Sequence, residues 1–305
     1  MEAMVNGIPV HYAEHGTGTP VLALHGGGVD HREIMGALEP LFAGRPGYRR
    51  VYPDLPGMGR TPAREMVDGA DAVLDTLLVL VDDVIGQETF LVVGHSYGGY
   101  LARAIANRRP RQVAGLALIC SLVGEQGGGD ERPEHVILHA AGDLDVDGAL
   151  EPAMAAEFRN YLVVQTPETL RRFQETVAPG VALTDQAAAE RIAARWQLRT
   201  APEQAPAYAN PTLILARTPG RHRRLRRGVA AAGALSASHL CRARPCRPWA
   251  GARAGRAGDR PNGGMAGPCP RGCRRCVTTT TVPVCGRRCI CRSSTLWPTR
   301  RWSRG

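Results

Sequence analysis

A serine set between glycines is the feature of this chain with the clearest chemical meaning, in the string GHSYGG at positions 94–99. The string follows 89–93, a short run of β-forming residues predicted to be a buried strand, and it precedes a predicted helix. Such a sharp strand-to-helix turn presents the serine hydroxyl as a nucleophile, and side chains at Gly94 and Gly98 would clash with neighbouring backbone. An ordinary glycine-rich turn with an incidental serine is the alternative, which this setting disfavours. Ser96 is therefore the predicted nucleophile.

A second string, His25-Gly26-Gly27-Gly28, directly follows a predicted strand and suits the stabilisation of an oxyanion. Acyl transfer to a serine passes through an oxyanion that needs two pre-aimed hydrogen-bond donors, and deleting one costs about 3–4 kcal/mol. We expect the backbone N–H groups of Gly27 and Tyr97 to be this pair, with Gly28 as the alternative to Gly27. The glycines let the loop approach a tetrahedral carbon. His25 is expected to hold the loop in place rather than to act as a base.

Predicted strands and helices alternate around these two strings, which is typical of a mainly parallel sheet covered by helices on both faces. The α/β core is expected to contain strands at 5–12, 19–24, 48–53, 89–93, 113–120 and 210–216, and helices at 30–41, 70–85 and 100–107. The clearest helix is 70–85, because Val73, Leu77 and Val81 share one face while acidic residues fall elsewhere.

The pattern changes between residues 121 and 208, where helix-like stretches occur at about 150–164, 167–177 and 185–198. A helical insertion between two strands is typical of a lid. The chain therefore divides into a core (1–120), a cap (121–208), a returning core strand (209–216) and a tail (217–305). Five apolar side chains of the cap are expected to line a substrate pocket, although their helical spacing fits a separate cap core equally well: Phe158, Tyr161, Leu162, Phe173 and Trp196.

Residues 1–216 resemble the α/β-hydrolase superfamily. The shared features are the string at 25–28, the turn DLPGMGR at 54–60, the elbow around Ser96 and the helical insertion after Cys120. The resemblance is to the cap-bearing branch, which includes proline iminopeptidases, carboxylesterases, epoxide hydrolases and carbon–carbon bond hydrolases. It implies the α/β-hydrolase fold, and it gives Asp54 and Gly57 a structural role in a turn beside the oxyanion loop. Serine rather than aspartate at position 96 argues against epoxide hydrolase and haloalkane dehalogenase chemistry.

The resemblance also implies a catalytic acid and a histidine, in the order serine, acid, histidine, and the chain departs from this order at Arg217. The acid is expected directly after the strand 210–216. The next acid is Asp259, however, and no further strand–helix pair is predicted. His222 and His239 are the histidines that follow, and neither has a supporting pattern.

A minority of the superfamily carries the acid after the preceding strand. In this chain that position offers Glu125 or Asp130. We expect both to be ordinary loop acids.

The composition also changes at residue 217. Residues 1–216 contain 17 Arg and 27 acidic residues, whereas 217–305 contain 21 Arg, one acid and eight of the nine cysteines. A basic nucleic-acid segment is one interpretation of this tail, and a metal module built on the cysteines between 269 and 291 is a second. The cysteine spacing matches no zinc pattern well. A third interpretation, translation in the wrong reading frame, is preferred.

The wrong-frame hypothesis can be checked against the residues themselves. If the intended codons take the last two bases of each residue and the first base of the next, Trp249-Ala250 must give Gly and Met265-Ala266 must give Trp. Codon degeneracy then allows an acid after residue 217, an amphipathic helix, a Gly-His-Gly string and a closing helix, which are the elements the resemblance requires. As written, the tail is expected to be largely disordered and to leave the strand 210–216 at an exposed sheet edge.

These residues predict hydrolysis of a carboxylic ester, amide or related acyl substrate through an acyl-Ser96 intermediate, without a metal or organic cofactor. The alternatives are a non-catalytic binding protein that lacks its acid and histidine, and a nucleic-acid-associated protein acting through the tail. No signal peptide or membrane-spanning stretch is recognisable, and a single cysteine before residue 217 fits a reducing compartment. We therefore expect a cytoplasmic protein with a small-molecule substrate, and neither a membrane nor nucleic acid as its partner.

Overall fold

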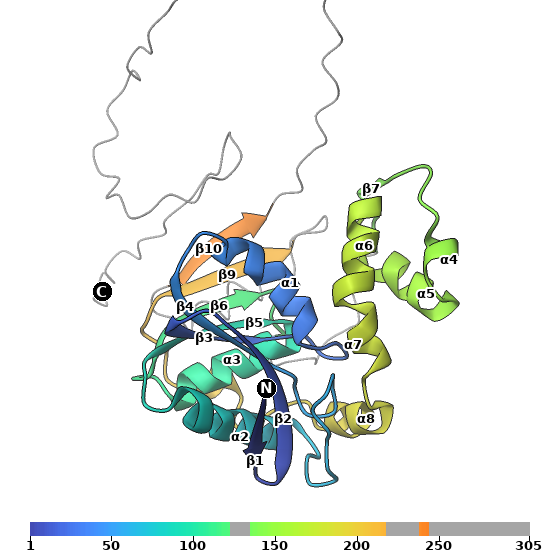
Figure 1. Cartoon of the computed structure of the whole chain (residues 1–305). Coiled ribbons are helices and arrows are strands. Elements are labelled where there is room, and N and C mark those ends of the chain that lie inside the picture. The colour runs from blue at the N-terminus through green and yellow to red at the C-terminus, as the bar shows by residue number, and fades with distance from the viewer. Residues whose placement is uncertain (123–134, 218–237, 244–305) are drawn as a thin grey trace, which may run out of the picture. The chain divides into compact units, whose positions relative to one another are not determined.

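The computed structural model describes residues 1–122, 135–217 and 238–243, which build an eight-stranded sheet in the order β1-β2-β4-β3-β5-β6-β9-β10 (Figure 1). The β1–β2 and β2–β4 pairs are antiparallel, and all the other neighbours in the sheet are parallel. This confirms the predicted fold class. The strands are β1 (Glu2–Val5), β2 (Ile8–His15), β3 (Gly18–Leu24), β4 (Gly47–Pro53), β5 (Phe90–His95), β6 (Val113–Ile119), β9 (Thr212–Arg217) and β10 (Ser238–Ala243).

The first predicted strand, 5–12, is wrong as a single element, because the chain turns back between β1 and β2. Val5 pairs with Ile8 across a two-residue loop, Asn6-Gly7. Both loop residues have positive φ, 48° and 76°, as a type I′ hairpin turn requires. The Asn-Gly pair is the strongest short-range sequence signal for such a hairpin, so the turn could have been predicted.

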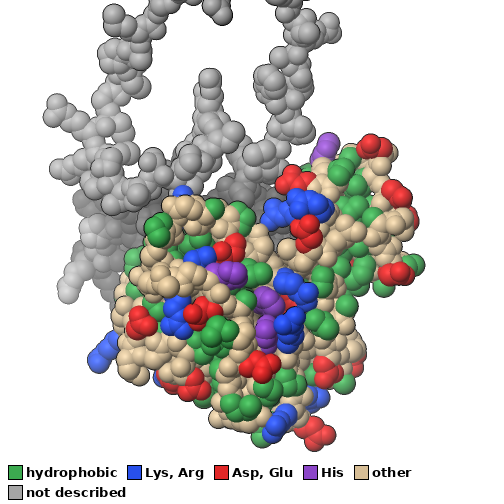
Figure 2. Space-filling view, in the orientation of Figure 1, with side chains coloured by type: hydrophobic (Ala, Val, Ile, Leu, Met, Phe, Trp, Pro, Cys, Tyr) green, Lys and Arg blue, Asp and Glu red, His purple; other side chains and the backbone are tan. Residues whose placement is uncertain are grey.

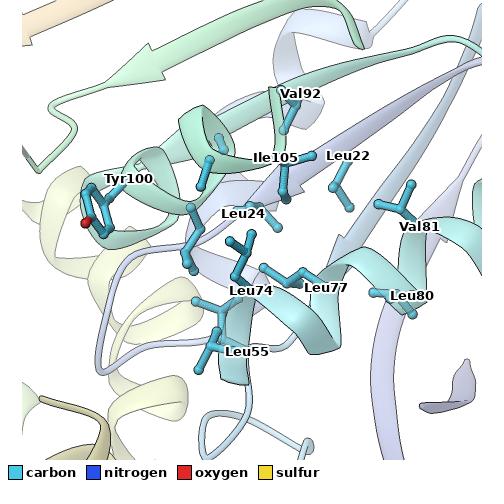
Figure 3. Packing of buried hydrophobic residues seen from close by; sticks show 14 of the residues in the cluster. Leu22, Leu24, Leu55, Leu74, Leu77, Leu80, Val81, Val92, Tyr100 and Ile105 are labelled. Carbon is cyan, nitrogen blue, oxygen red and sulfur yellow. The ribbon is translucent and has the colours of Figure 1, made fainter. Parts of the chain in front are cut away.

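Different helices cover the two faces of the sheet, because alternate residues of a strand point to opposite sides. Leu22 and Leu24 of β3 pack with the buried residues of α2 (Ala70–Leu80) and α3 (Ser96–Arg108), as Figure 3 shows. Ala23, between them, packs with Ile34 of α1 (His31–Phe42). As predicted, Asp30 caps α1, and its carboxylate accepts the backbone N–H of Arg32 at 3.0 Å.

The predicted helix 70–85 has the expected extent but not a uniform winding. Its last five residues, Val81–Ile85, form a π-helix. Gly86 ends it with φ of 69° and donates its N–H to the carbonyl of Val81 at 2.9 Å. Within the part of the chain that the structure describes, no helix is long and apolar enough to cross a membrane.

Helices fill most of the described segment between β6 and β9, as predicted for the cap. The elements are β7 (His139–Ala140), α4 (Val146–Ala149), α5 (Pro152–Tyr161), β8 (Val164–Gln165), α6 (Pro167–Thr176), α7 (Ala178–Ala182) and α8 (Gln186–Ala194). The short strands β7 and β8 pair with each other and form a separate sheet, which the sequence did not indicate.

The expectation that Phe158 and Phe173 line a substrate pocket is wrong. Both are buried in a small core that belongs to the cap itself, with ring centroids 5.5 Å apart in an edge-on arrangement. Leu162 packs against the same core, while Tyr161 is 69% exposed. Trp196 packs instead against the main core, 5.6 Å from the ring of Tyr100. Phe158, Leu162 and Phe173 therefore serve the packing of the cap, and Trp196 serves that of the main core.

The expectation that the tail leaves the strand 210–216 at an exposed sheet edge is wrong, because of residues 238–243. These residues form β10, which pairs in parallel with β9 from Ser238 opposite Thr212 to Ala243 opposite Arg217. The strand at 210–216 is therefore not the edge of the sheet. His239 lies on β10 in register with Leu213. Four other predictions fall outside the described residues: the loop acids Glu125 and Asp130, His222, and the rest of the tail.

Candidate active site

Ser96 occupies the sharp turn between β5 and α3. Its backbone has φ of 50°, which lies in the left-handed region that residues other than glycine rarely adopt. The residue is half-buried. This is the strained strand-to-helix turn that presents a hydroxyl at the carboxyl edge of a sheet. The first turn of α3 also points free N–H groups toward this edge.

The glycines around Ser96 are required by close backbone approach. A Cβ on Gly94 would overlap the carbonyl of Gly98, two residues beyond Ser96. A Cβ on Gly98 would lie 2.5 Å from the carbonyl oxygen of Leu24 and would also overlap that of His25. Because both obstacles are backbone atoms, neither can move aside as a side chain would. The packing of α3 against β3 therefore depends on Gly98.

The glycine string after β3 lies against this turn. A Cβ on Gly26 would be 3.6 Å from the Cβ of Ser96, and one on Gly27 would be 3.8 Å from the Cβ of Tyr97. Gly28 has φ of 75° and no atom within 4 Å of its Cβ position. The predicted oxyanion donors Gly27 and Tyr97 thus lie side by side, whereas Gly28 faces open space.

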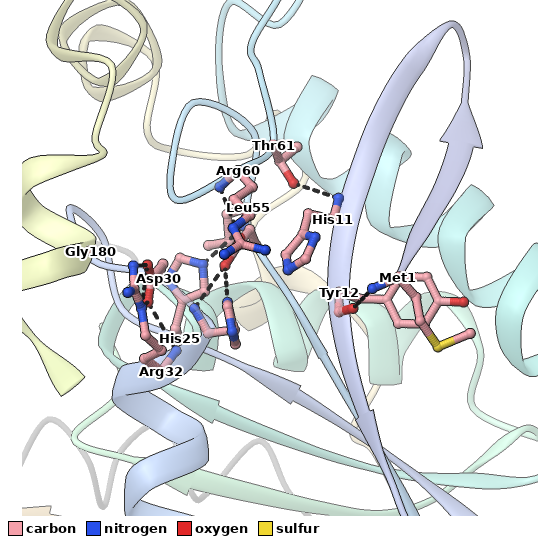
Figure 4. Close-up of polar contacts among 12 residues, drawn as sticks. Met1, His11, Tyr12, His25, Asp30, Arg32, Leu55, Arg60, Thr61 and Gly180 are labelled. Atoms are coloured by element: carbon pink, nitrogen blue, oxygen red, sulfur yellow. Dashed lines mark hydrogen bonds and ion pairs between the residues drawn. The ribbon is translucent and has the colours of Figure 1, made fainter. Parts of the chain in front are cut away.

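His25 is fully buried and fastens this loop to the turn after β4. Its Nδ1 lies 2.7 Å from the carbonyl oxygen of Gly26, and its Nε2 accepts the backbone N–H of Leu55 at 2.9 Å (Figure 4). The pair of contacts fits a neutral ring that carries its proton on Nδ1. Burial lowers the pKa of His25, which keeps the ring neutral. With both nitrogens engaged, His25 is held as a structural residue.

Asp54 organises the turn itself. Its Oδ1 accepts the backbone N–H of His31 at 2.9 Å and lies 2.7 Å from Nδ1 of the same residue. Its Oδ2 accepts the backbone N–H of Arg60 at 2.9 Å. Burial alone would raise the pKa of Asp54, but these hydrogen bonds hold it below its ordinary value. Gly57 has φ of 79° and accepts a hydrogen bond from Asp185 at 2.9 Å, which joins the turn to the cap.

Glu33, in the first turn of α1, is a site residue that the sequence analysis missed. Its Oε1 lies 3.0 Å from Nδ1 of His95, although the ring is not aligned for a hydrogen bond. Its Oε2 accepts the backbone N–H of Gly26 at 3.4 Å. Burial would raise the pKa of Glu33, but His95 and the Gly26 N–H hold it below its usual range. A carboxylate thus joins the glycine string 25–28 to the residue before Ser96.

Comparison with known proteins places the chain in a family. A family model described as "Alpha/beta hydrolase family" matches residues 21–270. The chain belongs to this family. A hydrolase of the α/β superfamily from Oenococcus oeni superposes with a TM-score of 0.67 at 24% identity, over 80% of this chain and 89% of that one. At this identity the likeness shows the fold alone.

Curated relatives match over a shorter stretch. The pimeloyl-[acyl-carrier protein] methyl ester esterase of Shewanella woodyi is 37% identical over 114 residues, or 37% of this chain and 40% of that protein. Epoxide hydrolase 3 of Siraitia grosvenorii is 34% identical over 113 residues, or 36% and 35% of the two chains. This chain thus spans about two fifths of the length of these relatives.

Proposed function

We propose that this α/β hydrolase cleaves a carboxylic ester, amide or related acyl substrate through an acyl-enzyme intermediate on Ser96. One observation carries the proposal: Ser96 lies in a left-handed turn at the start of α3, with Gly27 packed beside Tyr97. The position between these two backbone N–H groups suits the oxygen of a tetrahedral intermediate. The serine at position 96, rather than an aspartate, favours acyl transfer over the opening of an epoxide.

In the proposed reaction Ser96 Oγ attacks the acyl carbon, and its proton passes to a base. The carbonyl oxygen becomes an oxyanion that accepts hydrogen bonds from the N–H groups of Gly27 and Tyr97. Collapse of the intermediate breaks the bond to the leaving alcohol or amine, which takes up the proton, and water then hydrolyses the acyl-serine. His25 is not available as this base, because its ring is neutral and both of its nitrogens are already in hydrogen-bond contacts.

The base and its acid belong, by the family order, to the part of the chain after β9. That strand ends at Arg217 rather than at an acid. We propose that a shift of reading frame near codon 217 accounts for this, and that the alternative frame encodes the acid and the histidine. The nucleotide sequence tests the proposal directly. A stop codon in the alternative frame before the Gly-His-Gly string would rule it out.

The cap is proposed to set the choice of substrate, because α7 and α8 lie against the loops that form the site. A Cβ on Gly180 of α7 would be 2.6 Å from the backbone nitrogen of Asp30, and a Cβ on Gly57 would be 2.9 Å from the Cβ of Ala188 of α8. Exchanging residues 121–208 for the cap of another family member should change the preferred acyl group. An unchanged preference would count against this role.

The nucleophile is tested by labelling with a fluorophosphonate and by turnover of p-nitrophenyl esters. Labelling should disappear in Ser96→Ala and persist in Ser121→Ala, a matched control beside the site whose hydroxyl donates to the carbonyl of Leu122. Loss of a catalytic base typically lowers the rate by several orders of magnitude. We therefore expect weak labelling of the chain as given and strong labelling after the alternative frame is restored. Labelling that survives Ser96→Ala would contradict the assignment.

A non-catalytic binding protein is the second candidate, and the arginine at the end of β9 favours it. This candidate predicts a ligand-binding pocket without esterase turnover, whichever frame is expressed.

A nucleic-acid role for the Arg-rich tail predicts a salt-sensitive gel shift that disappears when 217–305 is deleted. We propose a cytoplasmic location for the protein.

A further inference from the structure

Three metal-binding side chains from separate parts of the chain meet next to the turn after β4. His11 comes from β2, His31 is the first residue of α1, and Asp54 follows β4. One nitrogen or oxygen atom of each residue lies within 4.8 Å of the corresponding atom of the other two. We propose that His11, His31 and Asp54 bind a divalent transition-metal ion through two imidazole nitrogens and one carboxylate oxygen.

The donor set selects the class of ion. Imidazole nitrogens suit zinc, copper, iron, cobalt and nickel, whereas calcium and magnesium prefer a shell of oxygen atoms. Two histidines and one carboxylate on one side of an ion leave further positions open to water. No thiol lies in the cluster, so the site does not require the cysteines of the tail.

An ion would replace the hydrogen bond that now joins two of the ligands. Nδ1 of His31 and Oδ1 of Asp54 are 2.7 Å apart, which is a hydrogen-bond distance. The proton of His31 would move to Nε2 when Nδ1 binds the ion.

The backbone holds these ligands in place without help from an ion. The N–H groups of His31 and Arg60 each donate to Asp54 at 2.9 Å, which fixes the plane of the carboxylate. The backbone N–H of His11 donates to Oγ1 of Thr61 at 2.9 Å (Figure 4). Such supporting contacts typically affect metal affinity by 10–100-fold in other proteins. The three ligands are thus positioned in advance.

His31 is the most exposed of the three ligands. The side chain of His31 is 12% exposed and His11 is 9% exposed, whereas Asp54 is fully buried. The two histidine rings are tilted by 54° relative to each other, with centroids 5.4 Å apart. Histidine side chains are visible on the face shown in Figure 2, with arginine and acidic side chains beside them.

Nearby positive charge opposes binding and gives an independent test. Arg60 and the N-terminal ammonium both act electrostatically on His11. Arg60→Ala removes one of these charges but keeps the backbone N–H that supports Asp54. This variant should therefore bind a divalent ion more tightly than the wild-type chain.

The test uses the full chain, stripped of metal with a chelator and with its thiols alkylated so that the nine cysteines cannot bind. Co²⁺ is the probe, followed by calorimetry and by visible absorption. The wild-type chain should bind one Co²⁺, and the ion should raise the thermal unfolding midpoint. His15→Asn, which removes an exposed histidine from the same strand, should behave like the wild type. His11→Asn should weaken binding at least about tenfold, because a direct ligand is lost.

Two results would overturn the proposal. The first is a wild-type chain that binds no Co²⁺ after alkylation, and the second is His11→Asn binding as tightly as wild type. If His11→Asn does not fold, as judged by circular dichroism, Arg60→Ala decides the matter. Tighter binding by this variant supports the site, and equal or weaker binding contradicts it.

Discussion

The carboxylate of Glu33 lies 3.0 Å from the imidazole of His95, the residue that precedes the proposed nucleophile. The second oxygen of the same carboxylate accepts the backbone N–H of Gly26. One side chain of α1 therefore spans the two strings of sequence, 25–28 and 94–99, that were identified separately as chemically meaningful. We infer from this place that Glu33 positions the loop 25–28, which is proposed to bind the oxyanion, relative to Ser96.

Replacing Glu33 should therefore impair reaction at Ser96 without unfolding the chain. In Glu33→Ala the Gly26 N–H loses its acceptor and the loop is held less firmly. Removing an oxyanion donor outright typically lowers the rate by about 10²–10³-fold. Because Glu33→Ala only loosens the loop that carries the donor, we expect a smaller loss, about tenfold, in the rate of fluorophosphonate labelling. Glu33→Gln keeps an oxygen acceptor and should retain most of the rate. Glu65→Ala, an exposed acid in the loop before α2, is the matched control. A Glu33→Ala rate equal to that of the control would exclude the positioning role.

Gly98→Ala should destabilise the chain strongly. The new Cβ would meet the carbonyl groups of Leu24 and His25, so α3 would have to move away from β3. Overpacking of this kind costs about 1–3 kcal/mol of the free energy of unfolding, and backbone obstacles place this case at the upper end. Gly142→Ala is the control, because no atom lies within 4 Å of its Cβ position. Denaturant unfolding of both variants measures the difference, and equal stabilities would show that the turn can relax.

Acidification should destabilise the chain through His25. Burial lowers the folded-state pKa of His25 below its ordinary value of 6.5. Below pH 6.5 the unfolded chain binds a proton that the folded chain does not. The free energy of unfolding should therefore decrease as the pH is lowered from 6.5 to the folded-state pKa of His25. The decrease is up to about 1.4 kcal/mol per pH unit for one titrating group. Unfolding free energies between pH 8 and 5 should show this slope.

A variant without the titrating ring separates His25 from other groups. His25→Phe should be less stable at every pH, since two hydrogen bonds are lost, but its stability should depend less on pH. His135→Asn, which changes an exposed histidine, should keep the slope of the wild type. An unaltered slope in His25→Phe would mean that other groups cause the acid sensitivity.

The separate core of the cap makes the effect of Phe158→Ala predictable. The ring is fully buried against Phe173, so truncation should cost about 3–5 kcal/mol of cap stability. Tyr161→Ala, at an exposed position on the same helix, should change stability by less than about 0.5 kcal/mol. Limited proteolysis within 135–200, read alongside labelling of Ser96, measures the cap and the core separately. Equal sensitivity of the two variants would contradict the assignment of Phe158 to the cap core.

The core of the fold was predictable because its signals are local. The Asp30 cap and the apolar face of 70–85 are each recognised from the residues of a single helix. The glycines around Ser96 are recognised from the residues of a single turn. The missed hairpin at Asn6-Gly7 also has a local signal, which the continuous β pattern of 5–12 concealed.

Other features depend on tertiary contacts and could not be read from periodicity. Glu33 and His95 are 62 positions apart and look like an ordinary helix acid and a turn residue. Phe158 and Trp196 have equivalent helical patterns, yet the first packs within the cap and the second on the main core. β10 lies in a stretch whose composition gives no strand signal, and its register with β9 is visible in the structure alone.

The central position of β3 affects the order in which the protein can fold. Leu24 pairs with Gly94, so the two halves of the site meet when β3 and β5 form their ladder. That contact closes a loop of about seventy residues, and the entropy lost in closing such a loop slows the step compared with the local β1–β2 hairpin. Ser96 should therefore acquire its reactivity late in folding. A nascent chain would then remain unreactive until its central strands have paired.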